Sequence, residues 1–274
     1  MILFICESVV KIVNNSIFSL CFLKGLIIKV EITENERIDD LEFEGLKIIQ
    51  NKEGFCFGID SILLTDFAKE IKPNSIVADL GSGTGIIPIL LSKKTKNTKF
   101  IGVEIQQEVA QMSKRSIFLN NLEDRIKIEE LNIIDLKEKY KKGSFDVVTT
   151  NPPYKQINTG LVNLNDKKLI SRHEIKASLS EFIKVSSYLL KDYGELYMVH
   201  RPERLVDIFY LMRDNNIEPK KIKFVYPNKN KKANIILIKG VKCGKPFLKF
   251  EDNLYVYDEK GNYTEEILRI YNKI

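Results

Sequence analysis

A glycine-rich turn between an apolar strand and an apolar helix constrains the fold of this chain more than any other feature. Residues 75–80 are predicted to form a buried strand, Gly81-Ser82-Gly83-Thr84-Gly85 the turn, and residues 86–92 the start of a helix. Strand, glycine turn and helix in this order form the first half of a nucleotide-binding βαβ unit, where glycines let the backbone approach a ligand closely. The sequence therefore predicts a doubly wound α/β fold with a mostly parallel sheet.

The glycine spacing and a nearby acid indicate the kind of ligand. A dinucleotide fingerprint runs Gly-x-Gly-x-x-Gly and places a pyrophosphate at the helix N-terminus. Here the glycines repeat at every second position, and Asp79 stands two residues before the first of them. An anionic Asp79 would repel phosphates, yet it could hold an amino-acid ammonium through water or backbone amides. We therefore expect S-adenosylmethionine, bound by Asp79 and by Gly81, Ser82, Gly83, Thr84 and Gly85.

Three further side chains are candidates for the rest of this cofactor. Residues 99–104 are predicted to form the next strand, which ends in Glu104, about 20 residues past the glycine turn, where such folds place a ribose-hydroxyl acceptor. Asn132, after a strand predicted near residues 125–131, could contact the adenine edge, with Asp135 as the competing residue. Phe57 could contact the adenine, although a core aromatic is the alternative.

The tetrapeptide Asn151-Pro152-Pro153-Tyr154 follows the apolar run 145–150, which is typical of a buried parallel strand. Ligands of doubly wound folds bind outside the carboxyl ends of strands. Because proline has no N–H and fixes the backbone, the carbonyls of Asn151 and Pro152 are free to face a ligand. We expect the Asn151 amide oxygen and the Pro152 carbonyl to accept both N–H bonds of a planar amine stacked on Tyr154. A simple proline-rich turn is the alternative.

These segments, in this order, resemble the class I S-adenosylmethionine-dependent methyltransferases that act on amino nitrogens. Residues 55–64 and 171–174 make the chain similar, more closely, to the tRNA1(Val) (adenine37-N6)-methyltransferase family, over about residues 38 to 240. The resemblance implies methyl transfer to the exocyclic nitrogen of adenine in tRNA, with Asn151, Pro152, Pro153 and Tyr154 as catalytic residues; Asn151 also lies beside the cofactor. Asn132 departs from the acid that such enzymes usually carry there.

Hydrophobic periodicity predicts three strands and two helices after the tetrapeptide. They are strands near residues 194–200, 219–226 and 233–239, and helices near residues 178–191 and 202–215. Ser178-x-x-Glu181 has capping-box form, and Pro202 suits a first helical turn. Together with the earlier strands this predicts a seven-stranded sheet. Residues 227–232 are too few for a parallel crossover, so the last strand should be antiparallel.

Before the first strand of this sheet, residues 41–57 are expected to form a β-hairpin around Lys52-Glu53-Gly54 that covers the cofactor site, and Asp60 to cap the following helix. The apolar run 12–23 is too short to cross a membrane, which needs about 20 residues. Since the composition turns acidic after it, we hypothesise that translation begins near Val30. The resulting division is a leader, an N-terminal hairpin and helix, a catalytic domain and a C-terminal extension, at residues 1–29, 30–72, 73–242 and 243–274.

Composition fits one large α/β domain with additions, since the chain has 274 residues and 44% hydrophobic content. Four cysteines without metal-binding spacing and two histidines make structural zinc and a disulfide framework improbable, and indicate a reducing cytoplasm. The formal charge of +6 is a modest attraction toward polyanions. A monomer is the expected state.

RNA contacts are predicted in the lysine-rich stretch of residues 219–232, which also carries Phe224 and Tyr226. Basic and aromatic residues together can follow a phosphate backbone and stack a base. A solvated hairpin is the alternative. The candidate RNA-binding residues are Arg172, His173, Lys229, Lys231 and Lys232.

Three other functions remain open. N5-glutamine methyltransferases of translation release factors share the tetrapeptide, because a glutamine amide also presents an NH₂ group, but they carry a helical domain in front. DNA amino-methyltransferases share it too, but they need a substantial target-recognition domain. A non-catalytic RNA-binding module that kept the fold would have no need of Asp79, Glu104 and Asn151.

Overall fold

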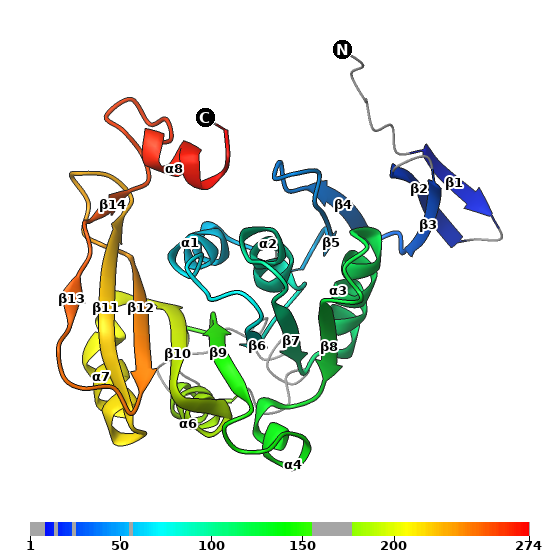
Figure 1. The fold of residues 1–274 in the computed structure, drawn as a ribbon. Coiled ribbons are helices and arrows are strands. Elements are labelled where there is room, and N and C mark those ends of the chain that lie inside the picture. Colours follow the sequence, from blue (N-terminus) through cyan, green and yellow to red (C-terminus); the bar gives the residue numbers. More distant parts are fainter. Residues whose placement is uncertain (1–8, 14–15, 24–25, 55–56, 155–176, 274) are drawn as a thin grey trace, which may run out of the picture.

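The computed structural model describes residues 9–13, 16–23, 26–54, 57–154 and 177–273, and their side chains from Val30 onward (Figure 1). A central sheet has the strand order β13-β11-β12-β10-β9-β6-β7-β8, with β14 also beside β11. Its parallel strands are β6 (Ile76–Leu80), β7 (Lys99–Glu104), β8 (Ile126–Glu130), β9 (Phe145–Thr150) and β10 (Leu190–His200). β12 (Ile235–Lys242) is antiparallel to both β10 and β11 (Ile217–Tyr226).

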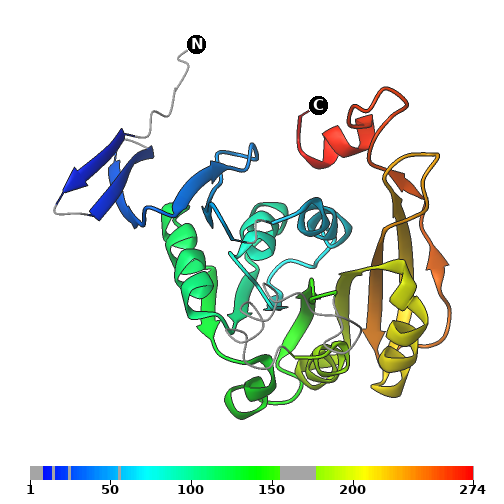
Figure 2. The same ribbon diagram turned by 180° about the vertical axis from the view of Figure 1, so that it is seen from behind.

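Helices cover both faces of this sheet, and the two views in Figures 1 and 2 agree on their placement. One face packs against α1 (Ile59–Phe67), α2 (Ile86–Lys94) and α3 (Gln107–Leu119). The other packs against η1 (Ile133–Asp135), α4 (Leu136–Lys139), α6 (Leu179–Leu189) and α7 (Leu205–Asp214), which the turn η2 (Pro202–Arg204) precedes.

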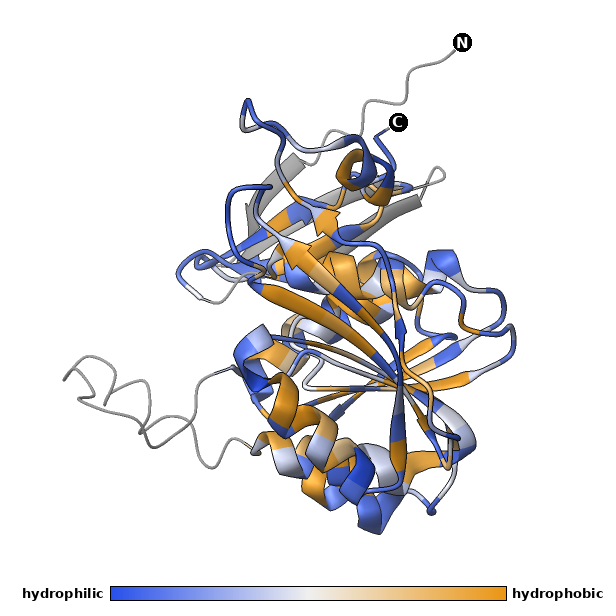
Figure 3. Ribbon diagram, turned by 90° about the vertical axis from the view of Figure 1, so that its left-hand side faces the viewer, coloured by the Kyte–Doolittle hydropathy of each residue, from blue (hydrophilic) through white to orange (hydrophobic). Residues whose placement is uncertain are grey.

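Alternation along the strands builds the two cores. In β6, Val77 belongs to one apolar cluster and its neighbour Ala78 to the other, because successive strand side chains point to opposite faces. Figure 3 shows the resulting apolar layer through the strands and the helix faces turned toward them. None of the described helices is long and apolar enough to cross a membrane.

The predicted fold is confirmed, including the antiparallel last strand, the Ser178–Glu181 capping box and the proline in the first turn of η2. The sheet is larger than the predicted seven strands. Its additional strands, β13 (Lys249–Phe250) and β14 (Leu254–Tyr255), come from the C-terminal extension and pair with β11, the strand that would otherwise end the sheet. The extension ends in α8 (Glu265–Ile270), which lies near α1.

The N-terminal hairpin exists, but its predicted turn is wrong. Strands β4 (Glu36–Asp40) and β5 (Lys47–Asn51) pair, and the turn lies at residues 41–46 rather than at 52–54. Glu42, Glu44 and Gly45 have positive φ, which no strand allows, and Leu41 N–H donates to the Leu46 carbonyl across the turn. The prediction was wrong because the apolar residues of this segment are spaced as in a strand, although Phe43 and Leu46 are buried side chains of a turn.

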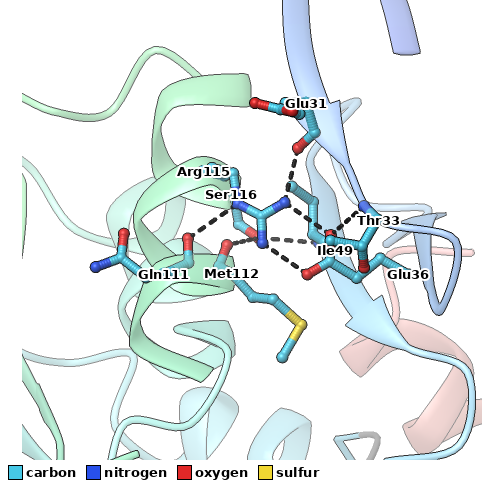
Figure 4. A network of polar contacts seen from close by, with 8 residues as sticks. All are labelled: Glu31, Thr33, Glu36, Ile49, Gln111, Met112, Arg115 and Ser116. Carbon is cyan, nitrogen blue, oxygen red and sulfur yellow. Dashed lines mark hydrogen bonds and ion pairs between the residues drawn. The ribbon is translucent and has the colours of Figure 1, made fainter. Parts of the chain in front are cut away.

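Arg115 of α3 connects this hairpin to the main domain (Figure 4). Its guanidinium donates to both carboxylate oxygens of Glu36, at 2.7 and 2.6 Å, and to the Glu31 carbonyl at 2.7 Å. On the same helix, the Ser116 hydroxyl accepts the Ile49 N–H of β5. Glu31 belongs to β3 (Leu26–Ile32), which forms a separate antiparallel sheet with β1 (Val9–Val13) and β2 (Ser16–Leu23). The hairpin therefore packs on α3, and its role as a cover of the cofactor site stays a prediction.

Candidate active site

The candidate site lies where the order of the sheet reverses. From β6 the chain continues through β7 and β8 on one side, and β9 and β10 lie on the other, so β6 and β9 are neighbours. Asp79 pairs with Thr149 and Leu80 with Thr150 in the register of these strands. The loops that follow them, residues 81–85 and 151–154, therefore leave the sheet side by side, at the position where doubly wound folds bind ligands.

The glycine turn presents bare backbone at this edge. Gly81, Gly83 and Gly85 have φ of 70°, 56° and 83°, a region that side chains other than glycine rarely adopt. A Cβ added to Gly83 would meet no atom within 4 Å, so one side of this residue is open to a ligand. Gly85 is the N-cap of α2, and a Cβ there would collide with the Ser113 hydroxyl of α3. The buried side chains of Ser82 and Thr84 stand between these glycines.

Two buried carboxylates flank the turn. Asp79 is fully buried and accepts hydrogen bonds from the hydroxyls of Thr149 and Ser82, both at 2.7 Å. Its burial, and to a smaller extent the charge of Glu104, raises its pKa to about 6. Glu104 accepts the N–H of Gly83 at 3.0 Å and of Gln106 at 2.9 Å. Two acids beside one open stretch of glycine backbone fit a ligand with an ammonium and a ribose diol, as S-adenosylmethionine has.

The other cofactor candidates, Asn132 and Phe57, contact parts of the chain outside the glycine turn. The Asn132 amide oxygen accepts the Ile134 N–H at 3.2 Å and so caps η1, and Asp135 lies at the end of that turn. Phe57 packs against the core beneath α1 and lines a cavity of about 150 Å³ together with residues of α1, α2 and α8. No residue of the glycine turn lines that cavity. Adenine contacts by Asn132 and Phe57 stay predictions.

At the end of β9, the tetrapeptide contacts the first turn of α1. Asn151 Nδ2 donates to the Ser61 hydroxyl at 3.3 Å, which turns its amide oxygen toward Tyr154. The Tyr154 hydroxyl lies 2.6 Å from Asp60 Oδ2 and 2.8 Å from Asn151 Oδ1. The predicted capping role of Asp60 is therefore wrong. The helix N-cap is Gly58, without a side-chain hydrogen bond, because the Asp60 carboxylate is turned to Tyr154 instead.

The last residue of β10 and the residue that follows it complete the surroundings of Tyr154, and sequence reasoning missed both. The Arg201 guanidinium lies 4.9 Å over the Tyr154 ring and donates to the Asn234 carbonyl. The His200 ring meets Tyr154 edge-on at 5.1 Å. Burial lowers the pKa of His200 to about 4, so this imidazole is neutral near pH 7. No local pattern marks these residues, since only the pairing of β10 with β9 brings them to the site.

The predicted RNA-binding lysines follow the same edge of the sheet. His200 pairs with Ile236 and Val225 with Ile235, so the loop between β11 and β12 leaves the sheet beside the end of β10. Lys229, Lys231 and Lys232 are exposed on this loop, and no described acid pairs with them. The other lysines of this stretch contact groups of the protein itself. Lys220 donates to the Lys245 carbonyl, and Lys221 and Lys223 form ion pairs with acidic side chains. Arg172 and His173 lie outside the described residues.

Within the described part of the chain, no group of three or more His, Cys, Asp or Glu side chains is arranged to hold a metal ion.

The chain matches a family model and is similar to several known proteins. Residues 58–212, over half of the chain, match the model of a family described as methyltransferase small domain. The chain is similar to the tRNA1(Val) (adenine(37)-N6)-methyltransferase of Porphyromonas gingivalis, at 25% identity over 85% of this chain and 93% of that protein.

Two solved structures share the fold. A predicted O-methyltransferase from Agrobacterium tumefaciens superimposes with a TM-score of 0.62 and 19% identity, over 78% of this chain and 95% of that one. The geranyl diphosphate C-methyltransferase of Streptomyces coelicolor A3(2), in complex with S-adenosyl-L-homocysteine, gives a TM-score of 0.50 and 13% identity, over 67% of this chain and 75% of that one.

Proposed function

Because this chain belongs to the methyltransferase small domain family, we propose that it methylates the exocyclic amino nitrogen of adenine in tRNA. The protein is an S-adenosylmethionine-dependent methyltransferase; the tRNA substrate is the proposed part. In this proposal it acts in the cytoplasm as a monomer. The observation that carries it is the position of Asn151 and Tyr154, directly beside the glycine turn, where an amine and the methyl donor would meet.

S-adenosylmethionine supplies a methyl group on a positively charged sulfur, which an amine lone pair can attack in line. In this proposal Asp79 attracts its ammonium group, Glu104 accepts its ribose hydroxyls, and the open backbone at Gly83 lets it lie close to the chain. The cofactor residues proposed on this basis are Asp79, Gly81, Ser82, Gly83, Thr84, Gly85, Glu104 and Asn151.

The chain's own contribution is to position a weak nucleophile. The lone pair of an adenine amine is delocalised into the ring, so the nitrogen attacks only when its geometry changes. The Asn151 amide oxygen and a second oxygen accept both N–H bonds, which turns the lone pair toward the methyl group. Tyr154, held by Arg201, stacks on the base. Positioning of this kind can supply on the order of 7 to 11 kcal/mol of the barrier. A base stacked in RNA must first be flipped out to reach this recessed edge.

Asn151→Ala should fold and still bind S-adenosylmethionine through Asp79, Glu104 and the glycine turn, while turnover falls by about a thousandfold or more, because the amine loses one of its two acceptors. Stability, cofactor affinity by calorimetry and methyl transfer to tRNA should be measured on one preparation. An Asn151→Ala protein that methylates as fast as the parent would show that this mechanism is wrong.

The substrate itself is tested in cells. tRNA from a strain without the gene should lack N6-methyladenosine at one position, and mass spectrometry of digested nucleosides measures the loss. Purified protein should restore it. If all tRNA nucleosides are unchanged and a release-factor glutamine loses its methyl group instead, the substrate is that protein rather than tRNA.

A further inference from the structure

The C-terminal extension carries a stack of three tyrosine rings that the proposed function does not use. The ring centroids of Tyr257 and Tyr263 lie 5.3 Å apart with an interplanar angle of 12°, and those of Tyr263 and Tyr271 lie 5.6 Å apart at 19°. Tyr271, at one end, packs against the hydrophobic core, whereas Tyr257, at the other end, is 40% exposed. The stack therefore runs from the core to the surface.

Local structure holds the outer two rings in place. Tyr257 and Tyr263 face each other in an antiparallel bridge, and in the turn between them the Asp258 carboxylate accepts two backbone N–H groups. Aromatic pairs directly opposite each other stabilise such a hairpin. The core does not require an aromatic ring at Tyr257, because the extension already contributes to it Leu254, Val256, Ile267 and Ile270.

The exposed end of the stack lies at the same edge of the sheet as the candidate active site. β14 is parallel to β11, and Figure 1 shows β14 and α8 at this end of β11. The Tyr257 N–H donates to the Pro227 carbonyl at 2.8 Å, where the loop between β11 and β12 begins. Neighbouring strands lie about 4.8 Å apart, so the path from β9 through β10, β12 and β11 to β14 spans about 19 Å.

An exposed aromatic ring beside a lysine-rich loop suits a single-stranded nucleic acid. Any base can stack on a tyrosine ring, and lysines contact the phosphates that connect the bases. The lysines of the loop between β11 and β12 supply this positive charge. In the turn next to Tyr257, the exposed side chains of Glu259 and Lys260 carry opposite charges that offset each other. The surface therefore favours a polyanion with exposed bases over a protein.

We propose that Tyr257 binds a second unpaired base of the RNA substrate by stacking, while the target adenine occupies the active site. Nucleotides in a helical stack rise about 3.4 Å each, and unstacked ones are further apart, so about 19 Å corresponds to fewer than about six nucleotides. The lysines of the loop between β11 and β12 hold the phosphates between the two bases. The inference rests on the proposed function, since it needs RNA as the substrate.

A tryptophan reporter tests the contact directly. The chain contains no tryptophan, so Tyr257→Trp introduces a single one and keeps an aromatic face. Its emission should be quenched when tRNA binds, because a base stacks on the indole. Tyr210→Trp is the matched control, since Tyr210 is 67% exposed on α7, which packs on a face of the sheet, and its emission should not change. Unquenched emission of Tyr257→Trp in the tRNA complex overturns the proposal.

Affinity measurements test whether the stacking matters for binding. Tyr257→Leu keeps an apolar side chain but removes the aromatic face, so the Kd for tRNA should rise about 5- to 150-fold. The slope of log Kd against log salt should stay the same, because stacking releases no counterions. Thermal unfolding confirms that the variant is folded, and Tyr210→Leu should bind tRNA as the parent does. A Kd equal to that of the parent overturns the proposal, and so does a reduced slope, which would mean that the lysines have lost their phosphate contacts.

Methyl transfer measured on the same preparations separates this inference from the proposed function. If the parent methylates tRNA adenine while the Tyr257→Trp emission stays unquenched, the function stands and the stacking contact is refuted. If the parent methylates a release-factor glutamine instead of tRNA, and that protein quenches the reporter, the RNA substrate is refuted as well and this surface binds a protein.

Discussion

At the scale of single residues, the charge of the buried Asp79 carboxylate affects how the site binds its cofactor. Asp79 is fully buried beside Glu104, and both hydroxyls that contact it are neutral. Without a ligand, these two acids repel each other, and Asp79 holds its charge only at a pH above about 6. A bound cation would compensate that repulsion. The cofactor should therefore bind best when Asp79 is ionised.

Cofactor affinity should consequently depend on pH. Asp79 gains a proton as the pH falls through about 6, so the attraction for the ammonium group is present above that value and lost below it. Between pH 7.5 and pH 5 the Kd for S-adenosylmethionine should rise by up to about tenfold. Calorimetry at several pH values measures this. Asp79→Asn should bind more weakly at pH 7.5 and show little further change, and a parent Kd that stays constant would contradict the prediction.

At the scale of elements, the attachment of the β4–β5 hairpin to α3 depends on a nearly buried carboxylate. Burial alone would favour the neutral acid of Glu36, but hydrogen bonds from Arg115 and the Thr33 N–H hold its pKa below the usual value of 4.5. The pair therefore stabilises the fold above about pH 4.5, and this contribution is lost as Glu36 becomes protonated at lower pH.

Arg115→Ala should lower the free energy of unfolding by about 2 to 3 kcal/mol, because it leaves the Glu36 carboxylate buried without its charged donor. Urea unfolding measures the change. Arg213→Ala is the control, since that arginine pairs with Glu218 at an exposed position, and its loss should cost at most about 1 kcal/mol. Equal effects of the two substitutions would show that the Arg115 contacts have no special weight.

At the scale of the whole molecule, the arrangement of the sheet places the lysine loop and the tetrapeptide on one edge. An RNA held by Lys229, Lys231 and Lys232 would extend from a base at Tyr154, because β10 and the β11–β12 loop end together. Lysines that contact phosphates release counterions, so binding should weaken with salt.

Replacing Lys229, Lys231 and Lys232 with glutamine should raise the Kd for tRNA about tenfold. It should also reduce the slope of log Kd against log salt by about 2 to 3. Cofactor affinity should not change. The matched control replaces Lys220, Lys221 and Lys223 with glutamine. This variant loses the same charge, but its three lysines already contact the protein, so its affinity for tRNA should change much less. Equal losses in the two variants would mean that only net charge matters.

The sequence alone determined those turns and strands whose conformation depends on residues close together in the chain. Glycines at every second position predict the turn after β6, and apolar runs ending in Glu104 and before Asn151 predict β7 and β9, because backbone conformation and burial alternation are local properties. The short link before β12 likewise fixed its antiparallel direction. Local pattern failed at residues 41–46, where a turn carries buried apolar residues.

Only the tertiary structure decided which side chains meet. Asp60 looked like a helix cap, but the packing of α1 beside the end of β9 brings it to Tyr154, 94 residues away in the chain. Thr149 reaches Asp79 across 70 residues because β6 and β9 are neighbours in the sheet. Hydrogen bonds act over about 3 Å, so their partners depend on strand register and helix packing, which no local pattern in the sequence contains.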